Sequence, residues 1–373
     1  MDKQSSLRFY FPLATQYTNQ GDLLINVCAA LILSRFGEVQ IDFGKCPAQF
    51  RNQFISLLAD KSSSISECPV SIRGLGIFSR IRFGKRLDWI ILPPGPKEWK
   101  QRRDFRRLIS SLLRISWVRL WRFFGGKVLS FGNSLAGGEV GGPDLLSLIQ
   151  LKQIDAFGLR SNHDVALARQ YSITNANYFP DLAFFGKDLF VERQLELARE
   201  CLVLSFRNDG DLTQNVIEEL IKFFASKYGS ELRILLVYQV EADAEFAELL
   251  VSQFAKVERT VHCIKLDDAT SLDFYRSARV VVSNRLHVCL AGLLCGAIPL
   301  FLSGREHYRK TSILLESVGL DAHVIDLNDI SNSLNSINHA GVLDKSQACL
   351  AEVINKQVDV GNKFFKKMFE VLY

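Results

Sequence analysis

Short apolar runs alternate with stretches of helical periodicity along most of the chain. The apolar runs predict buried strands at residues 7–13, 39–43, 89–92, 127–131, 156–159, 201–206, 233–237, 261–264, 279–283 and 297–302. Apolar residues spaced three and four apart predict helices at 22–36, 49–59, 211–228, 241–256, 285–296 and 309–318. Because strands separated by helices favour parallel pairing through right-handed crossovers, the pattern predicts an α/β protein with parallel sheets.

The length of 373 residues exceeds that of one ordinary domain. The apolar pattern is interrupted at residues 185–192, which predicts an N-terminal α/β domain at 1–187 and a C-terminal α/β domain at 188–373. We expect two Rossmann-like, doubly wound domains that face each other across a cleft. Ligands of such sheets bind beyond the carboxyl ends of the strands, so functional loops are expected there.

Composition narrows the class of protein further. Apolar residues make up 48% of the chain, which excludes intrinsic disorder. The longest apolar stretch, 288–302, is shorter than the roughly 20 residues of a membrane span and contains Pro299. The eight cysteines form no Cys-x-x-Cys pair, so neither a zinc site nor metal dependence is indicated. With no secretory signal at the N-terminus, we expect a cytoplasmic protein with reduced thiols.

The formal net charge of +5 is concentrated in one segment, because residues 73–127 hold 15 Lys and Arg against three acidic residues. Within 97–127, Leu, Ile, Trp and Phe follow helical spacing, and basic residues lie mainly off that stripe. A basic amphipathic helix with tryptophan is typical of an element that binds an anionic membrane surface. The alternative is a core-packing helix with a solvated basic face. Nucleic acid is not favoured as a partner, since no base-reading motif accompanies the charge.

The segment 280–299 is the most informative for chemistry. A buried strand ends at Ser283, and Asn284 is predicted to cap the next helix. Arg285 and His287 then lie in the first helical turn, where the helix dipole and a guanidinium favour a phosphate or carboxylate. The alternative is that Arg285 pairs with a carboxylate and His287 is a half-buried structural residue.

This segment resembles the Arg-Leu-His signature of the polysaccharide pyruvyl transferase family, here Arg285-Leu286-His287. Four further matches follow the family's order. They are the loop Asn19-Gln20-Gly21-Asp22, the strand end Phe157-Gly158-Leu159-Arg160-Ser161, the pair Pro180-Asp181, and Gly296-Ala297-Ile298-Pro299 after the signature helix. Lys310 stands where the family often carries a basic residue. The resemblance covers about residues 7–325.

The chain also departs from the family pattern at three places. Pro93-Pro94-Gly95 replaces a Gly-rich run, which restricts the backbone because proline fixes φ. Ser161 replaces an aspartate after Arg160, and Val288 replaces a glycine after the signature. None of these changes removes Arg160, Arg285 or His287.

The resemblance implies a GT-B-like enzyme that transfers a pyruvyl group from phosphoenolpyruvate to a sugar of an exopolysaccharide or other surface glycan, as a ketal. It implies that the substrates are bound by Arg160, Arg285, Leu286, Lys310 and Asn19. His287 is the expected general acid or base, since histidine titrates near neutrality, and Asp22 is the expected partner for a sugar hydroxyl. No cofactor is expected.

The N-terminal domain is expected on the acceptor side and the C-terminal domain on the phosphoenolpyruvate side. A lipid-linked acceptor would place the enzyme peripherally on the inner face of the membrane, held through residues 97–127. Two other classes stay open. One is a GT-B-type glycosyltransferase with a nucleotide-sugar donor, and the other is a non-catalytic glycan- or membrane-binding relative.

Overall fold

A computed structural model describes residues 7–17, 19–59, 61–68, 88–98, 105–136, 143–190, 199–207, 212, 214–229, 232–238, 243–254, 261–265, 273–304 and 306–370. The chain divides into two compact units. The first unit comprises residues 1–17, 22–182 and 359–373, and the second comprises 18–21 and 183–358. The division expected at 187/188 differs from these bounds in three ways: the main change of unit falls at 182/183, residues 18–21 group with the second unit, and 359–373 group with the first.

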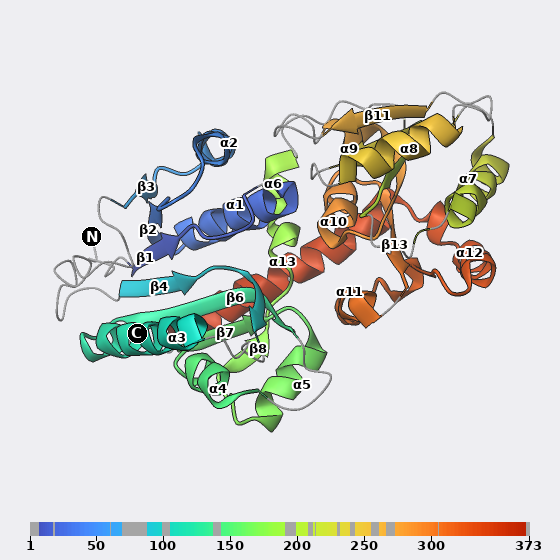
Figure 1. Cartoon of the computed structure of the whole chain (residues 1–373). Coiled ribbons are helices and arrows are strands. Elements are labelled where there is room, and N and C mark those ends of the chain that lie inside the picture. The colour runs from blue at the N-terminus through green and yellow to red at the C-terminus, as the bar shows by residue number, and fades with distance from the viewer. Residues whose placement is uncertain are drawn as a thin grey trace. The chain divides into compact units, whose positions relative to one another are not determined.

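The first unit is built on a parallel sheet with the strand order β3-β2-β1-β4-β6-β7-β8, in which β5 also pairs with β6 (Figure 1). Its strands are β1 (Leu7–Pro12), β2 (Gly37–Asp42), β3 (Ile65–Glu67), β4 (Asp88–Leu92), β5 (Gly95–Glu98), β6 (Lys127–Ala136), β7 (Ala156–Leu159) and β8 (Ala176–Tyr178). Its helices are α1 (Gln20–Ser34), α2 (Ala48–Leu58), α3 (Phe105–Phe123), α4 (Leu145–Lys152) and α5 (Asn162–Gln170). Helix α1 begins in residues that group with the second unit.

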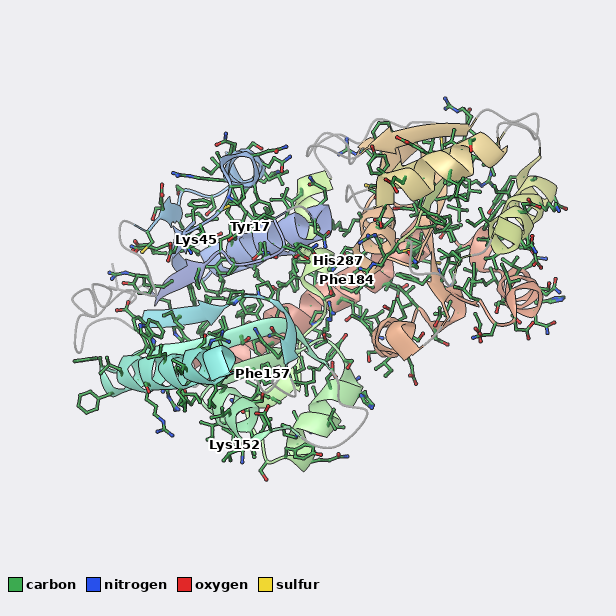
Figure 2. The ribbon with its side chains drawn as sticks, viewed as in Figure 1. Tyr17, Lys45, Lys152, Phe157, Phe184 and His287 are labelled. Carbon is green, nitrogen blue, oxygen red and sulfur yellow. The ribbon has the colours of Figure 1, made fainter. Side chains whose placement is uncertain are left out.

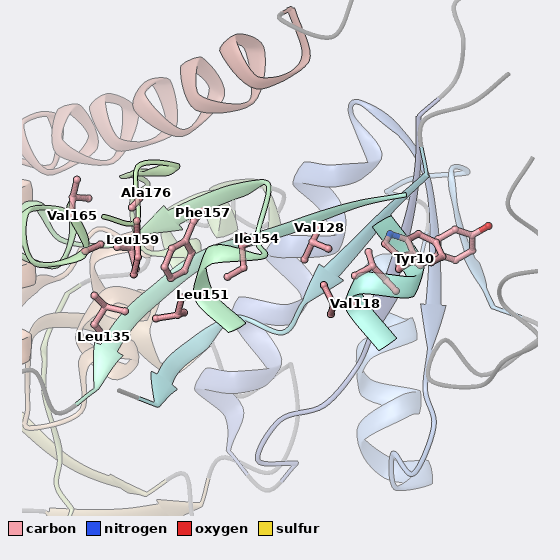
Figure 3. Packing of buried hydrophobic residues seen from close by; sticks show 14 of the residues in the cluster. Tyr10, Val118, Val128, Leu135, Leu151, Ile154, Phe157, Leu159, Val165 and Ala176 are labelled. Carbon is pink, nitrogen blue, oxygen red and sulfur yellow. The ribbon is translucent and has the colours of Figure 1, made fainter. Parts of the chain in front are cut away.

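Successive residues of β1 and β4 point to opposite faces of the sheet, as the period of a strand requires. Tyr10 and Ile90 lie in the core beneath α3, α4 and α5, which Figure 3 shows at close range. The neighbouring residues Phe9 and Trp89 contact Phe369 of the C-terminal helix, with ring centroids 5.8 and 6.0 Å apart. The end of the chain therefore seals the second face of the first sheet.

Helix α3 is amphipathic, but most of the apolar residues that were expected from their spacing to form one side of it are exposed. A different side of the helix is buried. Its buried residues are Ser111, Ile115, Val118 and Trp121. The Trp121 indole donates to the carbonyl of Lys127 at 2.9 Å, so it belongs to the core. The solvent side carries exposed apolar side chains together with arginines: Leu108, Ile109, Leu112, Leu113, Leu120 and Phe123, with Arg114, Arg119 and Arg122. The helix thus packs on the core and still presents a basic, apolar outer face.

The second unit holds another parallel sheet, in the order β11-β10-β9-β12-β13-β14. The strands are β9 (Cys201–Ser205), β10 (Arg233–Tyr238), β11 (Val261–Lys265), β12 (Ala278–Ser283), β13 (Ile298–Ser303) and β14 (Val324–Asp326). The helices are α6 (Lys187–Phe190), α7 (Gln214–Tyr228), α8 (Ala244–Phe254), α9 (Asp273–Ser277), α10 (Leu286–Leu294), α11 (Glu306–Val318) and α12 (Ile330–His339), with 3-10 turns at Leu182–Gly186, Asp321–His323 and Val342–Asp344. Helix α13 (Gln347–Glu370) begins in the second unit, and its residues from 359 onward group with the first. Every strand pair in the described residues is parallel, which confirms the predicted α/β class.

Helix α10 packs very closely on β12. A Cβ atom at Gly292 would lie 2.6 Å from Cγ2 of Val281, so only glycine allows this approach. The helix ends at Leu294, and Gly296, two residues later, has a φ of +80°, which is left-handed and favours glycine. The amide of Ala297 then donates to Gly292 O at 2.9 Å, and β13 begins at the next residue. The close packing fixes the start of α10 relative to the end of β12.

Candidate functional site

Arg160 lies at the carboxyl end of β7, in the first unit. One terminal nitrogen of its guanidinium is 2.8 Å from Oδ2 of Asp181, which is buried, and the other donates to Ser134 Oγ at 3.2 Å. The Arg160 amide donates to Asn133 O at 2.8 Å. Arg160 and Asp181, two motif residues 21 positions apart, are therefore held together with the end of β6. Asp181 therefore balances the charge of Arg160 within the first unit.

Ser161, which departs from the family pattern, has a structural role. Its hydroxyl accepts the amide of Asp164 at 3.0 Å and caps α5. Asp164 is itself buried, and burial raises the pKa of its carboxyl group despite the hydrogen bond with Ser161. Ser161 thus positions the helix that follows Arg160.

Asp22 lies in the first turn of α1 and binds the preceding loop. Its Oδ2 accepts the hydroxyl of Thr15 at 2.7 Å and the amide of Gln16 at 3.1 Å. Asn19 acts just before it, since its Oδ1 accepts the amide of Gly21 at 2.9 Å. Both candidate residues therefore shape the loop between β1 and α1.

Pro93-Pro94-Gly95, another departure from the family pattern, runs into β5, which begins at Gly95. Gly95 has a φ of +119°, which a residue with a side chain rarely adopts, and it pairs with Asn133 of β6. Residues 95–98 thus add a strand beside β6, where the family carries a flexible Gly-rich run.

Asn284 was predicted to cap α10, and this prediction is wrong. Its side chain instead spans to the segment after β9, accepting the amide of Arg207 at 2.7 Å and donating to the Arg207 carbonyl at 3.1 Å. The N-cap residue is Arg285, without a side-chain capping bond. The Arg285 amide donates to Ser283 Oγ at 2.9 Å, so Ser283 and Asn284 together fix the turn between β12 and α10.

Arg285 forms an ion pair with Asp243, which precedes α8 and is buried. A cation at a helix N-terminus opposes the helix dipole, and this had suggested an anionic ligand. The negative charge beside Arg285 is supplied by Asp243 of the protein itself. This agrees with the alternative that Arg285 pairs with a carboxylate. Asp243 carries no signal in the sequence, since no motif links it to a residue 42 positions later.

Leu286 and His287 form the first turn of α10, and both are half-buried. Figure 2 labels His287 among the side chains. Gly21, which groups with the second unit, lies against the imidazole. A Cβ atom at Gly21 would be 2.8 Å from both Cβ and Nδ1 of His287. The Asn-x-Gly motif and the Arg-Leu-His motif are thus in direct contact, which explains why a glycine is required in the first.

Lys310 lies in α11, and its side chain is outside the described residues. Of the candidate residues, the second unit brings together Arg285, Leu286, His287 and the loop of Asn19. Arg160 and Asp22 belong to the first unit. Within the described ranges, no group of three or more His, Cys, Asp or Glu side chains could hold a metal ion.

Two parallel α/β units with polar side chains at the carboxyl ends of their strands define a GT-B-like protein. The model of the family described as polysaccharide pyruvyl transferase matches residues 19–302. Since that match spans most of the chain, the protein belongs to the polysaccharide pyruvyl transferase family and is an enzyme of this kind. A comparison with curated protein sequences finds no match.

Solved structures confirm the fold. UDP-GlcNAc 2-epimerase from Neisseria meningitidis, bound to UDP-GlcNAc, is similar with a TM-score of 0.58 and 11% identity, covering 98% of this chain and 99% of that one. The epimerase from Methanocaldococcus jannaschii has a TM-score of 0.58 at 9% identity, covering 91% and 94%. Anabaena HepE in complex with UDP and glucose has a TM-score of 0.57 at 11% identity, covering 98% and 100%. At these identities the likeness shows the architecture alone.

Proposed function

We propose that this enzyme transfers a pyruvyl group from phosphoenolpyruvate to two hydroxyls of a sugar in a surface-glycan precursor such as an exopolysaccharide. The observation that carries the proposal is the position of Arg285 and His287 at the start of α10, within the family match over residues 19–302. The product is a cyclic ketal, and inorganic phosphate is released. No cofactor takes part in this scheme.

The reaction needs a proton at the vinyl carbon and the removal of protons from two hydroxyls. Protonation of the methylene carbon makes C2 electrophilic, and the first sugar oxygen bonds to C2 as its proton leaves. The second sugar oxygen then displaces phosphate from C2, and its proton departs with the phosphate. His287 is the group that holds or delivers these protons, because an imidazole can act as either acid or base near neutral pH.

The donor carries a phosphate and a carboxylate, and arginine binds both through paired N–H donors. Arg285 is anchored by Asp243 and Arg160 by Asp181, so each guanidinium is held in a fixed orientation. An arginine has five N–H donors, so such a pair leaves others for a ligand. Lys310 and the Leu286 backbone are further groups proposed to bind the donor, and Asn19 with Asp22 shapes the loop proposed to meet the sugar.

Mass spectrometry of the surface glycan from cells with and without the protein tests the reaction. Loss of the pyruvate ketal from the glycan supports the proposal, and an unchanged glycan refutes it. Donor binding distinguishes the proposed pyruvyl transferase from the alternative, a glycosyltransferase with a nucleotide-sugar donor. Protection from thermal unfolding by phosphoenolpyruvate, with none by UDP-glucose, is the expected result.

We also propose that the enzyme binds peripherally to a membrane surface through α3. No helix in the described part of the chain is long and apolar enough to cross a bilayer. The outer face of α3 carries Leu108, Leu112 and Phe123 beside Arg119 and Arg122, which suits peripheral binding to an anionic leaflet. Such binding would hold the enzyme at the inner face of the membrane, near a lipid-linked acceptor.

A further inference from the structure

The first unit contains a cavity of about 740 Å³ that no residue of the proposed donor site lines. It runs along one face of the sheet, from Val128 at the start of β6 to Pro12, Leu92 and Pro93 at the carboxyl ends of β1 and β4. Helices α3 and α4 form the other walls. In parallel α/β sheets ligands bind at the carboxyl ends of the strands. One end of the cavity therefore has the position of a ligand site.

Two cations share this cavity. Lys97 of β5 and Arg114 of α3 are the only charged side chains among the described residues that line it. No carboxylate in the described residues pairs with either one. The Lys97 ammonium donates to the carbonyl of Pro93 at 2.6 Å. Partial enclosure, together with the charge of Arg114, lowers the pKa of Lys97 to about 7. An anion between the two side chains would relieve this repulsion.

Hydroxyl and amide side chains from α4 extend the polar part of the cavity. Ser147 and Gln150 line it, and each can donate to an oxygen-rich group. A phosphate offers several acceptor oxygens, so it matches two cations and neutral donors better than a single carboxylate would. The polar lining thus favours a phosphate group.

The rest of the cavity is apolar and continues to the outside of the protein. Ile90, Ile115 and Trp117 line its interior. Leu113 also lines it and is 65% exposed, beside exposed Leu112 on the same helix. A ligand whose phosphate lies in the cavity could therefore run a hydrocarbon chain out along α3. A phosphate without a chain would leave this apolar surface uncovered.

We propose that the cavity beneath α3 binds the phosphate of an alkyl or polyprenyl phosphate, held by Lys97 and Arg114, with its hydrocarbon chain along Leu113. That this ligand is the carrier of the acceptor glycan rests on the proposed function. The binding site itself does not, because its ligand is recognised by charge and apolar surface alone. A free phosphate shares the anionic chemistry, so the test separates the two sources.

Calorimetric titration of the full chain with decyl phosphate, inorganic phosphate and decanol provides this test. Decyl phosphate is kept below the concentration at which it forms micelles. We expect decyl phosphate to bind at least about tenfold more tightly than either other probe, because it alone satisfies both the cations and the apolar wall. Equal affinity for inorganic phosphate would overturn the lipid part of the proposal. No binding of any probe would overturn the site.

Two variants locate the binding. Lys97→Met and Arg114→Gln each remove one cation and should weaken decyl phosphate binding about tenfold or more. Arg169→Gln is the matched control, since Arg169 is an exposed arginine of α5 in the same unit and does not line the cavity. Unchanged affinity in both cavity variants would overturn the assignment. Thermal unfolding checks that each variant is folded, and glycan mass spectrometry tests the transferase function independently.

Discussion

The guanidinium of Arg285 is paired with the carboxylate of Asp243, whose side chain is only 5% exposed. The cation at the start of α10 is thus balanced within the second unit. Asp243→Asn should lower the thermal stability, because removing one partner of a buried pair costs about 3–5 kcal/mol. Phosphoenolpyruvate should then raise the melting temperature more in this variant than in the wild type, since its anionic groups replace the lost counter-charge.

The control for this experiment is Glu200→Gln, which breaks the exposed pair between Glu200 and Arg233. Exposed pairs contribute little, so this variant should melt like the wild type with or without ligand. If Asp243→Asn were destabilised but phosphoenolpyruvate protected it no better than the wild type, Arg285 would not be a donor-binding residue.

His287 should be required for turnover and not for donor binding. His287→Gln keeps a polar side chain but cannot exchange protons near neutral pH, so transfer should fall by about 10²- to 10⁴-fold. Phosphate release measures the rate, and thermal protection by phosphoenolpyruvate measures binding. His339→Gln, an exposed substitution on α12, is expected to keep full activity. If His287→Gln released phosphate at the wild-type rate, His287 would not be the general acid or base.

Gly21 should be needed to place His287. In Gly21→Ala the new Cβ would meet the imidazole at 2.8 Å, well inside normal contact, so the ring or the loop must move. We expect a large loss of phosphate release from a folded protein, because a displacement of about 1 Å at a catalytic group can cost roughly 10²-fold. Gln20→Ala places the same alanine side chain one residue earlier without adding a new Cβ atom, and it should retain activity. Equal activity of the two variants would show that the contact is not needed.

The sequence was informative where chemistry or periodicity is local. The strands at 156–159 and 279–283 and the Arg-Leu-His turn could be predicted, since buried parallel strands form continuous apolar runs. The partners of the arginines could not, because Asp181 and Asp243 reach them only through tertiary contacts. The return of Phe365 and Phe369 to the first sheet was also invisible, since a C-terminal amphipathic helix does not encode which sheet it covers.

Alkyl phosphate binding should weaken as the pH rises above 7. Lys97 without ligand has a pKa of about 7, and a bound anion favours its protonated form. Between the two pKa values, each pH unit should reduce the affinity by up to about tenfold. Titrations of decyl phosphate at pH 7 and pH 9 measure this change. Lys97→Met should show a much flatter profile, and an equally steep one would assign the titration to another group.

His323 should make the protein less stable in acid. Burial and the nearby charge of Lys345 lower its pKa to about 4, although its hydrogen bond to Pro299 O at 2.9 Å partly opposes this. The unfolded chain, with an ordinary pKa near 6.5, takes up the proton first as the pH falls. Stability present above pH 6.5 is therefore lost between about pH 6.5 and 4, by up to roughly 3 kcal/mol.

Thermal unfolding of His323→Asn across this pH range measures the effect. Asparagine can keep a donor toward the Pro299 carbonyl but does not titrate, so the acid-induced fall in melting temperature should be smaller than in the wild type. His339→Asn removes an exposed histidine of the same unit and should leave the fall unchanged. Because the ring nitrogen of His323 also lies 3.1 Å from the Lys345 ammonium, protonation would set two cations side by side in a buried site. An identical acid profile in His323→Asn would assign the acid sensitivity to other groups.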